Sequence, residues 1–243
     1  MTRIGIISQA RMTSTRLPGK VLLESGGATM LAHHVSRLRS SGYPVYIATT
    51  TNATDDVIVE ESERLGVDGV SRGSEADVLS RFAVAADTFD LDAVVRVTSD
   101  CPLIDGLLIR QGVEKFLDLA DDHAFVSNTI ERTYPRGFDF EIFSATMLHE
   151  ADRHATSPSE REHVTPYLYA GEHPRTSLHA VRRSDATAEH YRVTLDTPED
   201  WALIDALIGT YEAQLLTGEQ IIDLLEAHPE LARINESVEQ KRI

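Results

Sequence analysis

Short apolar runs alternate with amphipathic segments along the first half of the chain. The apolar runs, which are typical of buried strands, are residues 3–8, 45–49, 93–98 and 124–127. The segments with apolar residues at helical spacing are residues 30–40, 55–65, 75–88 and 107–119. This alternation predicts an α/β fold with a mostly parallel, mixed sheet and helices on both faces. Sheets of this kind bind ligands at the carboxyl ends of their strands.

The second half of the chain departs from this pattern. Residues 132–143 (RTYPRGFDFEIF) combine turn residues with polar–apolar alternation, which predicts an extended or hairpin-like excursion from the main sheet. A helix is expected over residues 160–169, and strands are expected over residues 177–181 and 191–195.

A strong helix start follows the last of these strands. Thr197 can cap the helix and Pro198 suits its first position. A further amphipathic segment covers residues 217–227 and leads into a charged end. We therefore treat residues 1–243 as one domain that ends in a helical tail over residues 217–243.

Composition narrows the class of protein. Hydrophobic residues make up 42% of the 243 residues and charged residues 26%, as in a globular protein with a sizeable core. No apolar run reaches membrane-spanning length, and the N-terminus resembles a buried strand more than a signal peptide. The lone cysteine, Cys101, excludes an intrachain disulfide. These features predict a cytoplasmic protein that does not act on a membrane.

The charge balance limits the partners. The 23 basic and 39 acidic residues give a net charge of −16. An acidic surface repels phosphate backbones, which excludes nucleic-acid binding over a broad surface. A polyanionic small molecule would need a local basic pocket, so the places where Arg and Lys cluster are the most informative.

One such cluster is residues 9–20 (QARMTSTRLPGK), directly after the first strand. Arg11, Arg16 and Lys20 stand among hydroxyl residues and Gly19, a combination that can bind a phosphate through side chains and backbone N–H groups. The segment is not a Walker A loop, and the chain contains no GxGxxG motif. The alternative is an ordinary solvated loop between a strand and a helix.

Two aspartates follow predicted strands. Asp100 comes after the run 93–98, and Asp196 lies between the expected strand 191–195 and the helix cap Thr197. Carboxylates repel phosphates unless a cation lies between them, and Mg²⁺ suits this place because it takes few carboxylates and keeps substrate oxygens. The pair predicts a Mg²⁺ site at the edge of the sheet. Taken singly, each acid is equally explained as a turn residue or helix cap.

Other polar groups give weaker signals. Arg72 and Ser74 follow a strand-like segment, and their donors could read a base edge or a ribose. The charged residues 160–163 lie on an expected helix, where most such clusters are solvated. His33 and His34 are expected on a helix surface rather than as ligands.

Six segments occur together in an order that resembles one enzyme family. They are QARMTSTRLPGK, RGSEADVLSRF, VRVTSDCPLID, SNTIERTYPRGFDFEIF, EREHVTPYL and LDTPEDW. Together they resemble the cytidylyltransferases that include CMP-KDO and CMP-sialic acid synthetases, and most of all the spore coat polysaccharide biosynthesis type. The resemblance runs from residue 3 to near the C-terminus, where INESVEQK also resembles that type. It implies a Rossmann-like nucleotide-diphospho-sugar transferase fold and a homodimer built partly through residues 132–143.

The resemblance also implies roles for individual residues. The implied catalytic residues are Arg11, Lys20, Asp100 and Asp196, of which the two aspartates would hold Mg²⁺. The implied nucleotide-binding residues are Ala10, Arg11, Met12, Thr13, Ser14, Arg16, Lys20, Arg72, Ser74 and Ser99. The implied acceptor-binding residues are Arg136, Asp139, Glu141, Arg161 and His163.

Two residues depart from the family pattern. Thr13 and Ser99 stand where the family usually has glycine, which permits close backbone approach to a ligand. We therefore expect Thr13 to narrow or reshape the triphosphate site.

The implied reaction transfers CMP from CTP to an anionic sugar or a sugar-like acceptor, such as a phosphonate, and releases pyrophosphate. Alternatives are a sugar-1-phosphate uridylyl- or guanylyltransferase, a glycosyltransferase, and a non-catalytic nucleotide-binding protein on the same fold.

Overall fold

A computed structural model describes residues 2–170, 175–184 and 187–239. Its strands are β1 (Ile4–Gln9), β2 (Glu24–Ser25), β3 (Ala28–Thr29), β4 (Val45–Thr50), β5 (Gly69–Gly73), β6 (Ala93–Thr98), β7 (Ala124–Ser127), β8 (Glu141–Ser144) and β9 (Ser177–Ala180). Its α-helices are α1 (Met30–Arg39), α2 (Asp56–Leu65), α3 (Val78–Thr88), α4 (Gly106–Leu119), α5 (Ala145–His154), α6 (Pro158–His163), α7 (Pro166–Tyr169), α8 (Pro198–Tyr211), α9 (Gly218–Ala227) and α10 (Pro229–Ala232). Its 3₁₀ turns are η1 (Lys20–Leu22), η2 (Ala53–Asp55), η3 (Thr187–His190) and η4 (Ala213–Leu215).

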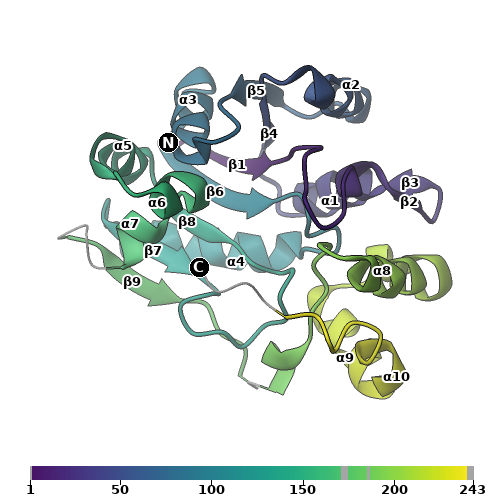
Figure 1. Cartoon of the computed structure of the whole chain (residues 1–243). Coiled ribbons are helices and arrows are strands. Elements are labelled where there is room, and N and C mark those ends of the chain that lie inside the picture. Colours follow the sequence, from purple (N-terminus) through teal and green to yellow (C-terminus); the bar gives the residue numbers. More distant parts are fainter. Residues whose placement is uncertain (1, 171–174, 185–186, 240–243) are drawn as a thin grey trace.

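Seven strands form one sheet in the order β5-β4-β1-β6-β8-β7-β9, as Figure 1 shows. Neighbouring strands are parallel except at β8, which is antiparallel to both β6 and β7. The predicted mixed, mostly parallel sheet is confirmed. After β1 the chain builds outward through β4 and β5 and then returns to the other side of β1 with β6. The strand order therefore switches between β1 and β6, and ligands bind at such a point.

The central strands are buried on both faces, because helices cover each face of the sheet (Figure 1). Ile6 and Val95 point into one core, which includes residues of α1 and α4. Ile7 and Val94 point into a second core, which includes residues of α3 and α5. Side chains alternate between the faces of a strand, so both positions of each pair must be apolar. This explains why these strands appeared as continuous apolar runs.

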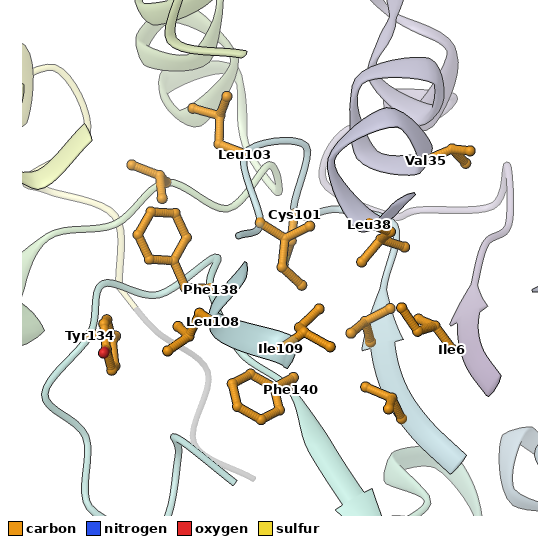
Figure 2. Close-up of a cluster of buried hydrophobic side chains, with 14 of the residues drawn as sticks. Ile6, Val35, Leu38, Cys101, Leu103, Leu108, Ile109, Tyr134, Phe138 and Phe140 are labelled. Atoms are coloured by element: carbon orange, nitrogen blue, oxygen red, sulfur yellow. The ribbon is translucent and has the colours of Figure 1, made fainter. Parts of the chain in front are cut away.

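Residues 132–143 lie within the body of the domain, contrary to the expected excursion. Phe138 and Phe140 are buried, and Figure 2 shows both rings beside Leu108 and Ile109 of α4. The end of the segment forms most of β8, in the interior of the sheet. The polar–apolar alternation therefore belongs to the segment that leads into β8. The pairing of β8 with β6 and β7 could not be predicted from the local sequence pattern.

The segment 191–195 is extended but is not a strand of the sheet, contrary to the prediction. It runs parallel to the chain at Arg136, where Arg136 N donates to Tyr191 O at 3.1 Å and Val193 N donates to Arg136 O at 2.7 Å. Gly137 allows this close approach, because a Cβ there would lie 2.6 Å from the Val193 carbonyl carbon.

The predicted helix over residues 160–169 is two short helices, α6 and α7. Val164 separates them with a positive φ of 73°, and Pro166 begins the second. The predicted start of α8 is confirmed, because Thr197 Oγ1 accepts from Asp200 N. The tail forms α9 and α10, while residues 240–243 of the predicted tail lie outside the described part of the chain. Within that part, no helix has the length and apolar character needed to cross a membrane.

Candidate active site

The loop of residues 9–20 folds back on itself at the carboxyl end of β1. Gly19 N donates to Met12 O at 3.0 Å, which closes the loop. Gly19 has a φ of 69°, a left-handed conformation that suits glycine. Met12 N donates to Asp55 Oδ1 at 2.9 Å, which fastens the loop to the end of η2. The turn brings Lys20 to the start of η1 with its side chain buried.

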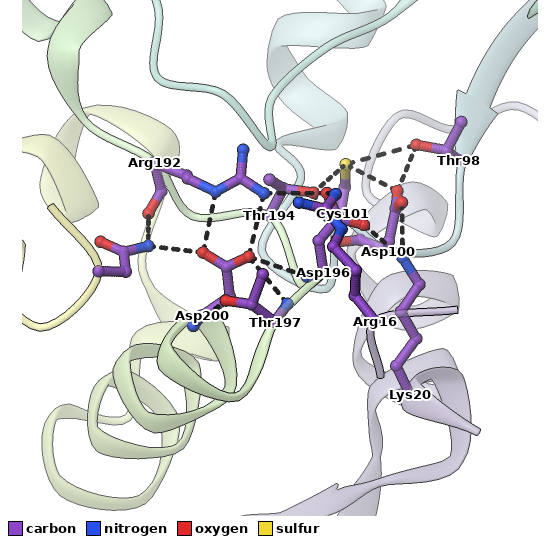
Figure 3. A network of polar contacts seen from close by, with 11 residues as sticks. Arg16, Lys20, Thr98, Asp100, Cys101, Arg192, Thr194, Asp196, Thr197 and Asp200 are labelled. Carbon is purple, nitrogen blue, oxygen red and sulfur yellow. Dashed lines mark hydrogen bonds and ion pairs between the residues drawn. The ribbon is translucent and has the colours of Figure 1, made fainter. Parts of the chain in front are cut away.

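Lys20 joins the two predicted acids. Its Nζ donates to Asp100 Oδ2 at 2.9 Å and to Asp196 Oδ1 at 2.7 Å, as Figure 3 shows. Burial alone would lower the pKa of Lys20, but the charges of Asp100 and Asp196 raise it above its ordinary value. The ammonium therefore stays charged at neutral pH.

Asp100 is held by the turn after β6 and by the segment of residues 191–195. Its backbone O accepts from Leu195 N at 2.7 Å, and its Oδ1 accepts from Thr98 Oγ1 at 2.5 Å. Burial favours protonation of Asp100, but the Lys20 ammonium and the hydrogen bonds hold its pKa below its ordinary value. Asp100 is therefore an anion at neutral pH.

Asp196 lies among cations. Arg16 Nη2 is 3.1 Å and Arg192 Nη2 is 2.9 Å from Asp196 Oδ2. Arg192 also forms a two-point ion pair with the fully buried Asp200, at 2.9 and 3.0 Å. The backbone N–H groups of Asp196 and Thr197 donate to Asp200 Oδ2. The start of α8, rather than the expected strand end, therefore fixes the position of Asp196.

A chain of hydrogen bonds lies under the turn that carries Asp100. His34 Nδ1 donates to Cys101 O at 2.8 Å, Ser8 Oγ donates to His34 Nε2 at 2.8 Å, and Ser99 Oγ donates to Ser8 Oγ at 2.8 Å. The carbonyl can only accept, so it sets these directions. His34 is fully buried, and its neighbour His33 is also buried, which corrects the prediction of a surface position for both. Burial lowers the pKa of His34 to about 4, so the ring is neutral.

A cavity of about 250 Å³, the first cavity, opens beside the loop of residues 9–20. Its lining residues are Gln9, Ala10, Arg11, Ser14, Thr15, Arg16, Lys20, Val21, Arg81, Thr98, Ser99, Asp100, His163 and Asp196. They include all four predicted catalytic residues. The predicted nucleotide-binding residues among them are Ala10, Arg11, Ser14, Arg16, Lys20 and Ser99.

A cavity of about 660 Å³, the second cavity, adjoins the first. Its lining residues are Gln9, Arg96, Val97, Thr98, Asp100, Cys101, Phe125, Thr129, Ile130, Arg132, Arg136, Gly137, Asp139, Phe140, Glu141, His163, Tyr169, Leu178, Thr194 and Asp196. The predicted acceptor-binding residues among them are Arg136, Asp139, Glu141 and His163. Asp100 and Asp196 line both cavities, so the two acids stand at the boundary.

Arg72 and Ser74 are not brought to either cavity. The Arg72 guanidinium donates to Thr50 O at 2.7 Å and to Asn52 O at 2.9 Å, and it pairs with Asp56 at 2.7 Å. These contacts join β5 to the turn after β4. Arg72 therefore ties a strand to the neighbouring turn.

Met12, Thr13 and Arg161 also lie outside the linings of both cavities. The Thr13 hydroxyl donates to a Glu75 carboxylate oxygen. The Thr13 side chain is therefore engaged with Glu75 outside the lining of the first cavity, and the narrowing or reshaping of the triphosphate site by Thr13 stays a prediction. Arg161 pairs with Asp77 at 2.5 Å and Asp152 at 2.8 Å, and these contacts raise its pKa, although burial acts against them.

Arg81 and Arg192 support the site and were not among its predicted residues. Arg81 lines the first cavity with only 1% of its surface exposed, and its Nη1 donates to Ser74 O at 2.6 Å. Burial lowers the pKa of Arg81 to about 10, so it remains a cation. Arg192 holds Asp196, and a sequence signal for it existed: Arg192, Thr194 and Asp196 alternate, so they share one side of an extended segment.

The oxygen donors at the boundary fit a divalent cation such as Mg²⁺. Asp100 and Asp196 already converge on one positive group, the Lys20 ammonium. Few carboxylates, completed by substrate phosphates and water, form the usual Mg²⁺ site. Over residues 2–170, 175–184 and 187–239, no set of three or more His, Cys, Asp or Glu side chains is arranged to hold a metal. The remaining ligands would therefore come from substrate and solvent.

A Rossmann-like sheet with a cationic loop facing two acids is the arrangement of a nucleotidyltransferase. The sequence profile of the family described as cytidylyltransferase matches residues 4–242. The chain therefore belongs to the cytidylyltransferase family and is a nucleotidyltransferase. One similar protein is the spore coat polysaccharide biosynthesis protein SpsF of Bacillus subtilis, with 33% identity over 98% of this chain and 100% of that protein. The resemblance seen in the sequence is confirmed.

Solved structures agree with this assignment. A cytidylyltransferase from Leptospira borgpetersenii has 32% identity, covers 100% of both chains and superposes with a TM-score of 0.91. A CMP:2-keto-3-deoxy-manno-octonic acid synthetase, solved in complex with CTP, has 18% identity and a TM-score of 0.60 over 86% of this chain and 100% of that one. At that identity, the second likeness shows the shared fold.

Proposed function

We propose that this cytidylyltransferase transfers CMP from CTP to an anionic sugar or sugar-like acceptor and releases pyrophosphate. The observation that carries the proposal is the position of Asp100 and Asp196 at the boundary of two adjoining cavities. A transfer reaction needs two substrates to meet at one point, and the boundary supplies that point. The first cavity is the proposed CTP site and the second is the proposed acceptor site.

The first cavity suits a triphosphate. Arg11, Arg16, Lys20 and Arg81 line it, in a chain whose net charge is −16. Cationic side chains inside a partly enclosed site attract an anion more strongly than the same charges on an open surface. We assign Lys20 and Arg11 to the phosphates of CTP, with Ser14 and Arg16 shaping the loop around them.

The second cavity suits an acceptor with a negative charge. Arg132 pairs with Asp139 at 2.6 Å, and Arg96 pairs with Glu141 at 2.6 Å, so these four charges are balanced. Arg136 lines the same cavity, and its side chain has no hydrogen-bond or ion-pair partner in the described part of the chain. A free guanidinium in a cavity fits a carboxylate, phosphate or phosphonate, which it can bind through two N–H groups.

The remaining groups of the second cavity suit a sugar ring. Asp139 and Glu141 offer carboxylate oxygens, and His163 stands where the two cavities meet. Burial lowers the pKa of His163, so its ring is neutral at pH 7 and can accept or donate one hydrogen bond to a hydroxyl. The acceptor is thus proposed to be a polyol with one anionic group.

The chemistry is positioning and charge neutralisation. Asp100 and Asp196 are the residues that would hold Mg²⁺, which when bound supplies positive charge at the α-phosphate and orients the attacking oxygen. An acceptor oxygen in the second cavity attacks the α-phosphorus, its proton leaves to solvent or to a nearby base, and the bond to the β-phosphate oxygen breaks. Lys20 and Arg11 stabilise the charge that develops on the pyrophosphate.

Two further expectations belong to the same proposal. A homodimer is proposed, which light scattering of the purified chain tests. The proposed compartment is the cytoplasm, because the only cysteine, Cys101, is buried and no intrachain disulfide is available to the chain.

The test is a matrix of nucleotides and acceptors. Pyrophosphate release is measured with CTP, UTP, GTP and ATP against nonulosonic acids, sugar phosphates and phosphonates, with and without EDTA. The proposal predicts release with CTP and an anionic acceptor, a CMP conjugate in the mass spectrum, and loss of both with EDTA. Preference for UTP or GTP would indicate a sugar-1-phosphate nucleotidyltransferase. Consumption of a sugar nucleotide supplied in place of the NTP would indicate a glycosyltransferase, and no turnover with any pair would indicate a binding protein.

A further inference from the structure

The C-terminal segment after α10 reaches Asp196 through a chain of buried contacts. Asn235 Nδ2 donates to Asp200 Oδ1 at 2.8 Å and to the backbone O of Arg192 at 3.0 Å. Arg192 in turn donates from Nε and Nη2 to Asp200, and from Nη2 to Asp196 Oδ2 at 2.9 Å. Figure 3 shows the Arg192 guanidinium directed toward Asp200 and also toward Asp196.

These contacts are shielded from water. The exposed fractions are 4% for Asn235, 0% for Asp200 and 8% for Arg192. Asp200 accepts from both side chains and from the backbone N–H groups of Asp196 and Thr197. A buried ion pair adds little net stability compared with apolar packing, but it fixes the orientation of the groups it joins. Here these contacts lead to Asp196, whose orientation they therefore fix.

We propose that Asn235 and Asp200 are positioning residues that fix Asp196 for cation binding. They hold the planar Arg192 guanidinium so that Nε and Nη2 donate to Asp200 while Nη2 also donates to Asp196. Arg192 and Arg16 then restrain Asp196 Oδ2, which leaves Asp196 Oδ1 directed at Lys20 and the boundary of the two cavities. The proposal rests on the proposed function, because it assigns Asp196 to the metal of the CTP complex.

Direct measurement of metal binding tests this role without an acceptor. The Mn²⁺ dissociation constant is measured by electron paramagnetic resonance for wild type and Asn235→Ala, each saturated with CTP. Outer partners of metal ligands typically change metal affinity by 10–100-fold, so we expect the constant to rise about tenfold in Asn235→Ala. Glu236→Ala removes the exposed neighbouring side chain and should bind Mn²⁺ like the wild type.

Several outcomes separate positioning from simple structural support. A lower melting temperature with unchanged Mn²⁺ affinity in Asn235→Ala would overturn the proposal. If Asn235→Ala does not fold, Arg192→Lys replaces it, because lysine keeps the charge but lacks a fork that spans both carboxylates. The same rise in the Mn²⁺ constant is expected there, and an unchanged constant would again refute the role. A wild type that binds no Mn²⁺ with CTP would contradict the proposed function as well, whereas tight binding that neither variant weakens would contradict the positioning role alone.

Discussion

Lys20 Nζ lies 2.7 Å from Asp196 Oδ1, so the loop after β1 meets the acid before α8 across a sequence separation of 176 residues. The ammonium also contacts Asp100, and it neutralises part of the charge of both acids. In the proposed reaction, Asp100 and Asp196 would hold a divalent cation between their carboxylates, and Lys20 would turn to the phosphates of CTP. The loop and the two acids therefore form one candidate active centre, and replacing a residue of either part has its own expected effect.

Replacing Asp100 by alanine should abolish most turnover while the fold survives. A bound metal contributes several kcal/mol of transition-state stabilisation, so loss of one of its two carboxylates should lower the rate at least about a hundredfold. Pyrophosphate release from CTP gives the rate, and far-UV circular dichroism gives the fold. Asp122→Ala, which removes an acid outside both cavities, is the control. Normal CMP transfer by the Asp100 variant would defeat the metal assignment.

Replacing Lys20 by alanine should weaken the use of CTP and strengthen metal binding without nucleotide. The variant loses a phosphate contact, so its kcat/KM for CTP should fall by roughly 10–100-fold.

The Lys20→Ala variant also frees the Asp100 and Asp196 carboxylates, so Mn²⁺ should bind the nucleotide-free variant more tightly than the wild type. Titration of Mn²⁺ measures the second effect directly, with Lys115→Ala, an exposed lysine, as the control. Unchanged kinetics with CTP would remove Lys20 from the site.

Replacing Arg136 by alanine should affect the acceptor and spare the nucleotide. The proposed ion pair between its guanidinium and the acceptor is a charge-assisted contact, so its loss should raise the KM for the acceptor about tenfold or more. The KM for CTP should change little, because Arg136 does not line the first cavity. Arg182→Ala, which removes an exposed arginine paired with Glu131, should leave both constants unchanged. Equal rises in both constants would contradict the assignment of the second cavity.

The buried His34 predicts a pH dependence of stability. Burial lowers its pKa from 6.5 to about 4, so between these values the unfolded chain binds a proton that the folded chain does not. Stability from neutral His34 is therefore fully present above pH 6.5 and falls as the pH drops toward 4, by roughly 3 kcal/mol at most. Urea unfolding from pH 7.5 to 4 should show this slope in wild type and in His154→Gln.

His34→Gln supplies the contrast for that slope. Glutamine can still donate to Cys101 O but does not titrate, so the variant should be less stable at pH 7 and lose less free energy of unfolding on acidification. A slope identical to that of the wild type would show that other groups cause the pH dependence.

The sequence predicted the fold and the centre of the site for identifiable reasons. The core strands are buried on both faces, so their apolar runs were unambiguous, and Lys20, Asp100 and Asp196 each follow directly from a recognisable local signal. The resemblance to a family then joined signals that lie far apart in the chain. Local patterns could not supply the pairing of β8 between β6 and β7, because that depends on distant partners.

Some positions depend on tertiary contacts that a sequence pattern does not show. Arg72 and Arg161, predicted to bind ligands, lie outside the linings of both cavities and pair with Asp56 and Asp77, contacts that no local spacing reveals. Arg81 was overlooked because its place on α3 resembles an ordinary helix position, and only the packed structure shows it buried in the wall of the first cavity.

The position of a divalent cation in the complex with CTP tests most directly whether Asp100 and Asp196 form the metal site. Crystals grown with Mn²⁺ and CTP, measured at a wavelength that gives manganese anomalous scattering, locate the ion without reference to activity. We expect one strong peak bound by the carboxylates of Asp100 and Asp196 and by an α-phosphate oxygen, with Lys20 moved onto the phosphates. A peak that touches neither carboxylate, or a triphosphate bound outside the first cavity, would contradict it.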